Sequence, residues 1–97
     1  MRALMKVKIG ALTYRVVRVK KIAGDPEARG EIDFVSKTIR ILEGMDKDVE
    51  TEVILHECTH GISPNMGEQA VHTFSNRFFQ LLTENPQFTR RLYKPSK

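Results

Sequence analysis

The feature that most constrains this chain is a pair of histidines four residues apart, His56 and His60, with Glu57 directly after the first. Residues four apart share one face of an α-helix, so a helix here lets both imidazoles bind a single metal ion. Glu57 then lies beside that ion, where its carboxylate can act on water. The pattern therefore predicts a helix that carries a zinc site.

Length and composition favour one small domain. The chain has 97 residues, of which 40% are hydrophobic, so we expect a single domain over residues 1–97 with a modest core. It has no run of about eighteen apolar residues and no N-terminal stretch typical of a secretory signal. One cysteine excludes an internal disulfide. These features predict a cytoplasmic protein with no membrane partner.

The basic residues are unevenly placed. Lys and Arg exceed Asp and Glu by 16 to 12, with clusters in residues 2–21 and 90–97. Such clusters are compatible with an acidic or nucleic-acid partner. The alternative is that the first cluster forms the solvent side of half-buried strands. We favour the strands, because aromatic residues or a reading helix usually accompany a nucleic-acid site.

Alternating side chains and β-branched residues predict a small antiparallel sheet in the first half of the chain. Residues 5–9 alternate lysine with apolar residues, and a second strand runs from residue 14 to 19. The runs 31–35 and 38–42 are separated by two residues and look like a hairpin. We expect the run 38–42 to lie at the sheet edge, where it either holds an extended peptide added to the sheet or simply covers the core.

Apolar spacing and capping residues predict two main helices. The first begins at Asp46 or Asp48, carries both histidines and ends at Gly61. The second opens at Glu68 and ends before Pro86, after which a short third helix is expected. The sequence thus predicts an α+β fold, in which the sheet packs on the histidine helix and a second helix.

A catalytic zinc site normally has three protein ligands and a fourth position for water. Cys58 is two residues from each histidine and points to the other side of the helix, so we expect a small buried residue there. Glu68 is the preferred third ligand, because a carboxylate is a normal zinc donor and follows a return turn. Its alternative role is to interact with the helix dipole.

His72 lies four residues after Glu68 and shares its helix face. It is the replacement ligand if Glu68 does not bind zinc. Otherwise His72 contacts the metal ligands without binding the ion, donates a hydrogen bond to the transition state, or is a partly exposed histidine without a function.

With His56, Glu57, His60 and Glu68 in place, the chain resembles the small zincin metallopeptidases with an HExxH motif, and among them the compact phage and bacterial proteins of the ImmA/IrrE type. The resemblance covers most of the chain after Gly30. It implies a minimal zincin-like fold, one zinc ion (Zn²⁺) and hydrolysis of a peptide or protein substrate. The departures are Cys58-Thr59, which is less apolar than usual, and Val71 in place of an alanine.

The resemblance implies that Glu57 is the general base for a water activated by zinc. His72 and Tyr14 are the candidates to stabilise the oxyanion that forms. The alternative function is a non-catalytic binding or regulatory module with structural zinc, contacting an acidic partner or nucleic acid. A third interpretation treats the two histidines as ordinary helix residues. Glu57 favours the enzyme, because a structural zinc site has little use for an acid that is not a ligand.

Overall fold

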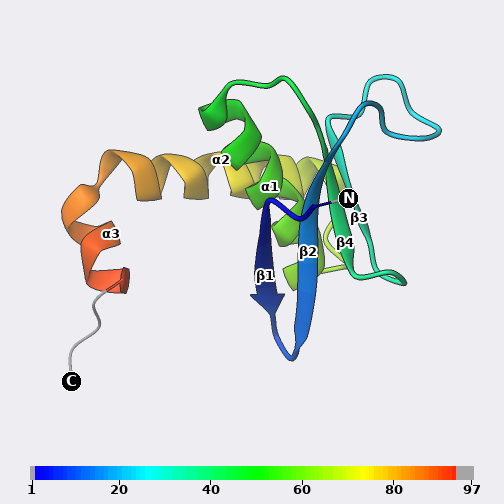
Figure 1. The fold of residues 1–97 in the computed structure, drawn as a ribbon. Coiled ribbons are helices and arrows are strands. Elements are labelled where there is room, and N and C mark those ends of the chain that lie inside the picture. The colour runs from blue at the N-terminus through cyan, green and yellow to red at the C-terminus, as the bar shows by residue number, and fades with distance from the viewer. Residues whose placement is uncertain (1, 94–97) are drawn as a thin grey trace.

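Four β-strands precede three α-helices along the chain (Figure 1). The structure, a computed structural model, describes residues 2–93. The strands are β1 (Met5–Ile9), β2 (Leu12–Val19), β3 (Gly30–Asp33) and β4 (Thr38–Leu42). The helices are α1 (Lys47–Ile62), α2 (Glu68–Glu84) and α3 (Pro86–Tyr93). The predicted α+β class is confirmed, and β1 and β4 have the predicted bounds.

The strand β3 is shorter than the sequence predicted, because a turn begins at its last residue. The Asp33 carboxylate accepts hydrogen bonds from the backbone N–H groups of Val35 and Ser36, at 3.0 and 3.1 Å. Lys37 then adopts a φ of 57°, in the left-handed region. Asp side chains commonly hold such turns by bonding to the backbone two residues on.

The sheet is mixed, so the prediction of an antiparallel sheet was wrong for one strand pair. Its order is β1-β2-β4-β3, and β2 pairs with β4 in parallel while the other two pairs are antiparallel. Of the two hairpin strands, the more apolar β4 takes the inner position, where its Ile39 and Ile41 are completely buried. The strand with Glu31 and Asp33, β3, takes the edge of the sheet.

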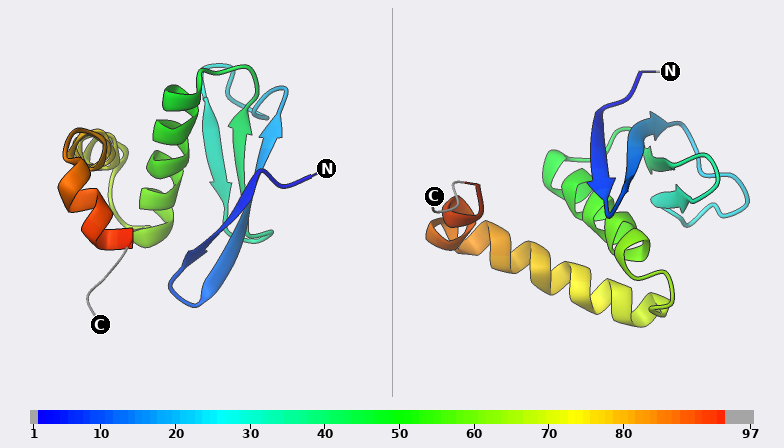
Figure 2. Two further views of the ribbon diagram at one scale, coloured as in Figure 1. Left: turned by 60° about the vertical axis from the view of Figure 1, so that its left-hand side comes forward. Right: turned by 90° about the horizontal axis from the view of Figure 1, so that it is seen from below.

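The core lies between one face of the sheet and α1. Figure 2 (left) shows α1 along this face, with α2 and α3 on the side of α1 away from the sheet. The central core residues are Tyr14, Val16, Ile39, Ile41 and Ile54. The basic side chains of β1 and β2 are exposed, as the strand interpretation predicted. None of the described helices is long and apolar enough to cross a membrane.

Glycine allows β3 to approach α1 closely. A Cβ atom on Gly30 would lie 2.8 Å from Cγ1 of Val53, 3.2 Å from the carbonyl oxygen of Arg40 and 3.3 Å from Cγ of Glu57. Distances below 3.0 Å require a neighbour to move. The edge strand therefore lies directly against the part of α1 that carries Glu57.

An ion pair joins α1 to the sheet near the start of the helix. Glu50, which is 8% exposed, accepts hydrogen bonds from Nε and Nη2 of Arg18 on β2, at 2.7 and 2.9 Å. The Arg18 guanidinium lowers the pKa of the Glu50 carboxyl. This contact fixes the first turns of α1 against β2. The histidines lie further along the helix, toward its C-terminal end.

Candidate metal centre

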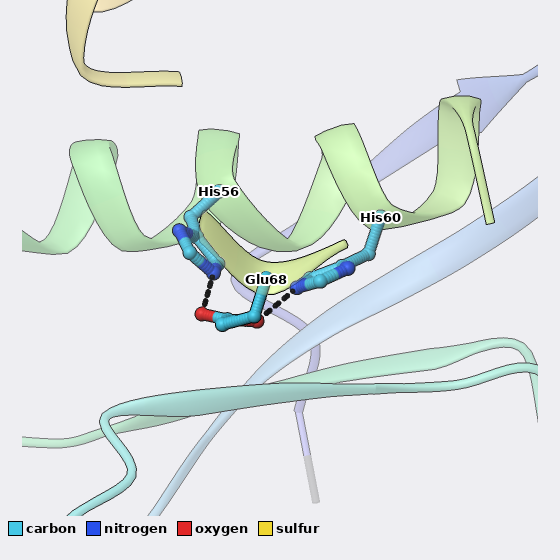
Figure 3. A group of neighbouring side chains, drawn as sticks. All are labelled: His56, His60 and Glu68. Atoms are coloured by element: carbon cyan, nitrogen blue, oxygen red, sulfur yellow. Dashed lines mark hydrogen bonds and ion pairs between the residues drawn. The ribbon is translucent and has the colours of Figure 1, made fainter. Parts of the chain in front are cut away.

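Two helices bring three potential ligands together. His56 and His60 lie on one face of α1, and Glu68 is the first residue of α2 (Figure 3). One carboxylate oxygen of Glu68 is 3.0 Å from Nε2 of His56, and the other is 2.9 Å from Nε2 of His60. The ligand atoms of all three residues lie within 4.8 Å of one another.

The connection between α1 and α2 is tight enough to return Glu68 to the histidines. The backbone N–H of Ser63 donates to the carbonyl of Thr59 at 3.0 Å, and that of Met66 donates to the carbonyl of Ser63, also at 3.0 Å. These turns reverse the chain within a few residues after α1 ends. Glu68 therefore lies beside residues that precede it by eight and twelve positions.

The donor set suits a zinc ion. Zinc binds imidazole nitrogen and carboxylate oxygen at about 2.0–2.2 Å, so neighbouring ligand atoms in a tetrahedral site are about 3.3 Å apart. The Glu68 oxygens lie 2.9 and 3.0 Å from the two histidine nitrogens, as in a hydrogen-bonded pair, and the ligand atoms of the three residues lie within 4.8 Å of one another. The histidine side chains are 18% and 22% exposed and that of Glu68 is 73% exposed, so the centre opens to solvent on the carboxylate side.

Burial favours the neutral form of His56, which is the form that binds metal ions. Burial lowers the pKa of His56; the other two histidines add to this effect, while Glu68 opposes it. A lowered pKa favours the neutral imidazole, which can bind a metal ion through a nitrogen lone pair once its Nε2 contact with Glu68 is exchanged for the ion.

Glu57 faces the same cleft from a much more enclosed position. It is 7% exposed, and its carboxylate has no hydrogen-bond partner within residues 2–93. Burial raises the pKa of Glu57 to about 7, with smaller contributions from the negative charges of Glu68 and Glu31. A nearby cation would offset part of this rise. A carboxyl group with such a pKa can accept and return a proton near neutral pH.

His72 lies beside this group but is not one of its three donors. Its ring centre is 6.3 Å from that of His56, and its Nε2 is 3.1 Å from the side-chain amide nitrogen of Asn76. With Nε2 accepting from this amide, the ring proton of His72 is on Nδ1. Asn76 was missed by sequence reasoning, although its spacing of four residues from His72 was a usable signal.

The two remaining candidates lie elsewhere. Tyr14 is 3% exposed in the core, edge-on to Phe34 at 6.5 Å between ring centres, and does not line the cleft. The structure thus places the Tyr14 ring in the core and outside the cleft, which leaves His72 as the candidate oxyanion donor. Cys58 is partly buried against the core, and burial raises the pKa of its thiol to about 11.

The centre lies in a cleft of about 890 Å³ between β3, the β2–β3 loop, α1 and the start of α2. The strand β3 is the sheet edge on this side, whereas β4 lies between β2 and β3. The prediction that residues 38–42 form an edge open to a peptide was therefore wrong. The burial of Ile39 and Ile41 accounts for the inner position of β4.

Comparison with known protein families, curated proteins and solved structures gives no match for this chain.

Proposed function

We propose that this protein is a zinc-dependent metallopeptidase, a zincin-like hydrolase of the ImmA/IrrE type. In this proposal His56, His60 and Glu68 hold the ion, and Glu57 is the general base. The observation that carries it is the convergence of the three donors within 4.8 Å, in the cleft that Glu57 also lines. A closed structural site would need a fourth protein ligand, and the group found among residues 2–93 has three.

A bound zinc ion supplies Lewis acidity, which polarises a carbonyl oxygen and makes water a stronger acid. Glu57 accepts a proton from the attacking water and later returns it to the leaving amine. Its raised pKa makes it a stronger base than an ordinary glutamate. The two histidines and Glu68 act as ligands, and none of them needs to move a proton.

The free edge of β3 is a suitable place for the substrate backbone. An extended peptide can add to a sheet edge through main-chain hydrogen bonds, which bind many sequences without reading each side chain. Because Gly30 brings this edge against α1, a peptide paired with β3 would pass close to Glu57. This placement replaces the one predicted for residues 38–42.

His72 is our candidate donor to the oxyanion that develops on the attacked carbonyl. With Nε2 bonded to Asn76, the Nδ1–H group is available to donate. Loss of such a donor commonly costs about 10²–10³ in kcat. We expect His72→Ala to show this loss while its zinc content is unchanged, whereas a ligand role for His72 would lower both.

The first test is the metal content of the purified protein by elemental mass spectrometry, for the wild type and Glu68→Ala. We expect near-stoichiometric zinc in the wild type and a sharp decrease in the variant. Glu43→Gln is the control, because Glu43 is exposed and outside the cleft. A wild type that takes up no zinc after reconstitution would contradict the proposal. Zinc without any peptide hydrolysis would instead support a binding module.

A further inference from the structure

The cleft has the opposite charge to the chain as a whole. The chain has a net charge of +4, with 16 basic and 12 acidic residues. Arg29 is the one basic residue, counting Lys and Arg, among the residues that line the cleft. Six of the twelve acidic residues line it, namely Asp25, Glu27, Glu31, Glu52, Glu57 and Glu68. The candidate substrate site is thus the part of a basic protein where negative charge is concentrated.

Three of these six carboxylates have partners among residues 2–93. Glu31 pairs with Arg40 at 2.9 Å, and Glu68 contacts the two candidate histidine ligands. Asp25 accepts the backbone N–H of Glu27 at 2.9 Å and so stabilises its own turn. The carboxylates of Glu27, Glu52 and Glu57 have no ion pair or hydrogen bond within the described chain, and of these Glu52 is partly buried and is not assigned to proton transfer. It is therefore available to bind a cation from a ligand.

Glu52 lies four residues before His56, so both face the cleft from the same side of α1. One helical turn rises about 5.4 Å, and an extended peptide advances about 3.3 Å per residue. A side chain one or two residues from the cleaved bond would therefore reach Glu52. The β2–β3 loop, with Asp25 and Glu27, lies at the same end of the molecule as the first turns of α1 (Figure 2, left).

A second observation indicates a ligand with donor groups. The residue Glu57 is 7% exposed, and its carboxylate faces the cleft without a hydrogen-bond partner among residues 2–93. Its neighbours include Gly30 on β3, which offers no side chain to pair with it. No buried side-chain oxygen among the described residues lacks a partner, so the Glu57 carboxylate is open to the cleft, where a ligand with a proton donor or a positive charge can pair with it.

We propose that this cleft selects peptides with a Lys or Arg side chain one or two residues from the cleaved bond, and that Glu52 is the main contact for that cation. The proposal rests on the metallopeptidase function proposed above. Glu27 is the second acidic group at this end of the cleft.

The test uses short randomised peptide libraries that each carry one fixed Lys, Gln or Glu. The zinc-loaded wild type is incubated with each library, and the cut sites are read by mass spectrometry. We expect Lys or Arg to be enriched one or two residues from the cut. Glu52→Gln should lower the ratio of cleavage between the Lys and Gln libraries about fivefold, the effect of one partly exposed ion pair. Glu43→Gln should leave this ratio unchanged.

Binding of the same libraries to the wild type, by fluorescence anisotropy, is a second readout. The preference for the Lys library should weaken as salt increases, because ions screen exposed charges. Cleavage without basic enrichment, or enrichment that Glu52→Gln does not reduce, would overturn the selectivity. Preferential binding of the Lys library with no cleavage by the zinc-loaded protein would support the acidic cleft and overturn the peptidase function. If the zinc-loaded protein neither cleaves the libraries nor prefers to bind the Lys library, both the peptidase function and the basic selectivity are overturned.

Discussion

Glu57 and Glu68 are glutamates that face one cleft in opposite surroundings. Glu57 is 7% exposed and unpaired, whereas the Glu68 side chain is 73% exposed and contacts both histidines. Burial favours the protonated form of a carboxyl and makes its anion a stronger base, while exposure lets a charged ligand remain hydrated. The same residue type is therefore suited to proton transfer at one position and to metal binding at the other.

The separation of roles predicts different losses on mutation of these two glutamates. Glu57→Gln removes the proton acceptor at nearly constant shape, so we expect unchanged zinc content and a decrease in peptide hydrolysis of about 10²–10⁴. Glu68→Ala should lose zinc and hydrolysis together. Parallel measurements of metal content and kcat on the two variants would check this. Full activity of Glu57→Gln would exclude Glu57 as the base.

At the scale of elements, the contact between β3 and α1 depends on a missing side chain. We expect Gly30→Ala to destabilise the protein by about 1–3 kcal/mol, because the new methyl group displaces Val53 or separates strand from helix. The matched control is Gly67→Ala, whose Cβ would meet nothing within 4 Å. Alanine at position 67 lowers the conformational entropy of the unfolded chain, which stabilises the fold, but it is a weaker N-cap for α2 than glycine. These two effects on the free energy of unfolding should cancel to within about 1 kcal/mol. Urea denaturation of both variants measures the difference, and equal midpoints would contradict the close-packing argument.

The ion pair between α1 and β2 predicts how stability depends on pH. Arg18 lowers the pKa of Glu50 in the folded protein below its ordinary value of 4.5. The ion pair therefore adds to the free energy of unfolding. This stabilisation is fully present above pH 4.5 and is lost as the pH falls through the lowered pKa of Glu50 in the folded protein. Glu50→Gln should therefore flatten the loss of stability on the acidic side, while Glu43→Gln should not. Thermal melting points over a pH series would show the difference, and identical acid limbs for wild type and Glu50→Gln would refute the assignment.

Periodicity in the sequence predicted the elements better than their arrangement. Alternation and helical spacing depend on neighbouring residues, so β1, β4 and the start of α2 were placed correctly. The order of strands depends on which hairpin strand buries more apolar surface, and this is decided by the whole sheet. Likewise, spacing brought His56 and His60 together, but the acidic cleft with Glu52 forms only when α1, β3 and the β2–β3 loop meet.

At the scale of the whole molecule, α1 is the layer that connects the sheet to the other two helices. The sheet packs on one side of α1 and α2 on the other (Figure 2). Only Val71 and Ser75 of α2 are buried, and both lie in its first half. The attachment of α2 therefore depends on the turns near Glu68, where the candidate metal centre also lies. An ion held by both helices would stabilise this attachment directly.

This arrangement predicts that zinc stabilises the folded protein as well as serving its chemistry. Because an unfolded chain does not hold His56, His60 and Glu68 together, zinc at a hundred times its Kd should add about 2.7 kcal/mol to the free energy of unfolding. We expect Tm to rise on zinc addition and to fall again with a chelator, whereas His60→Ala should show neither change. His72→Ala is the matched control and should keep the zinc response if His72 is not a ligand. A zinc response that survives His60→Ala would mean that the ion binds elsewhere. Hydrogen exchange would show where the ion binds. An ion at the proposed centre should slow exchange at the start of α2 more than in β1.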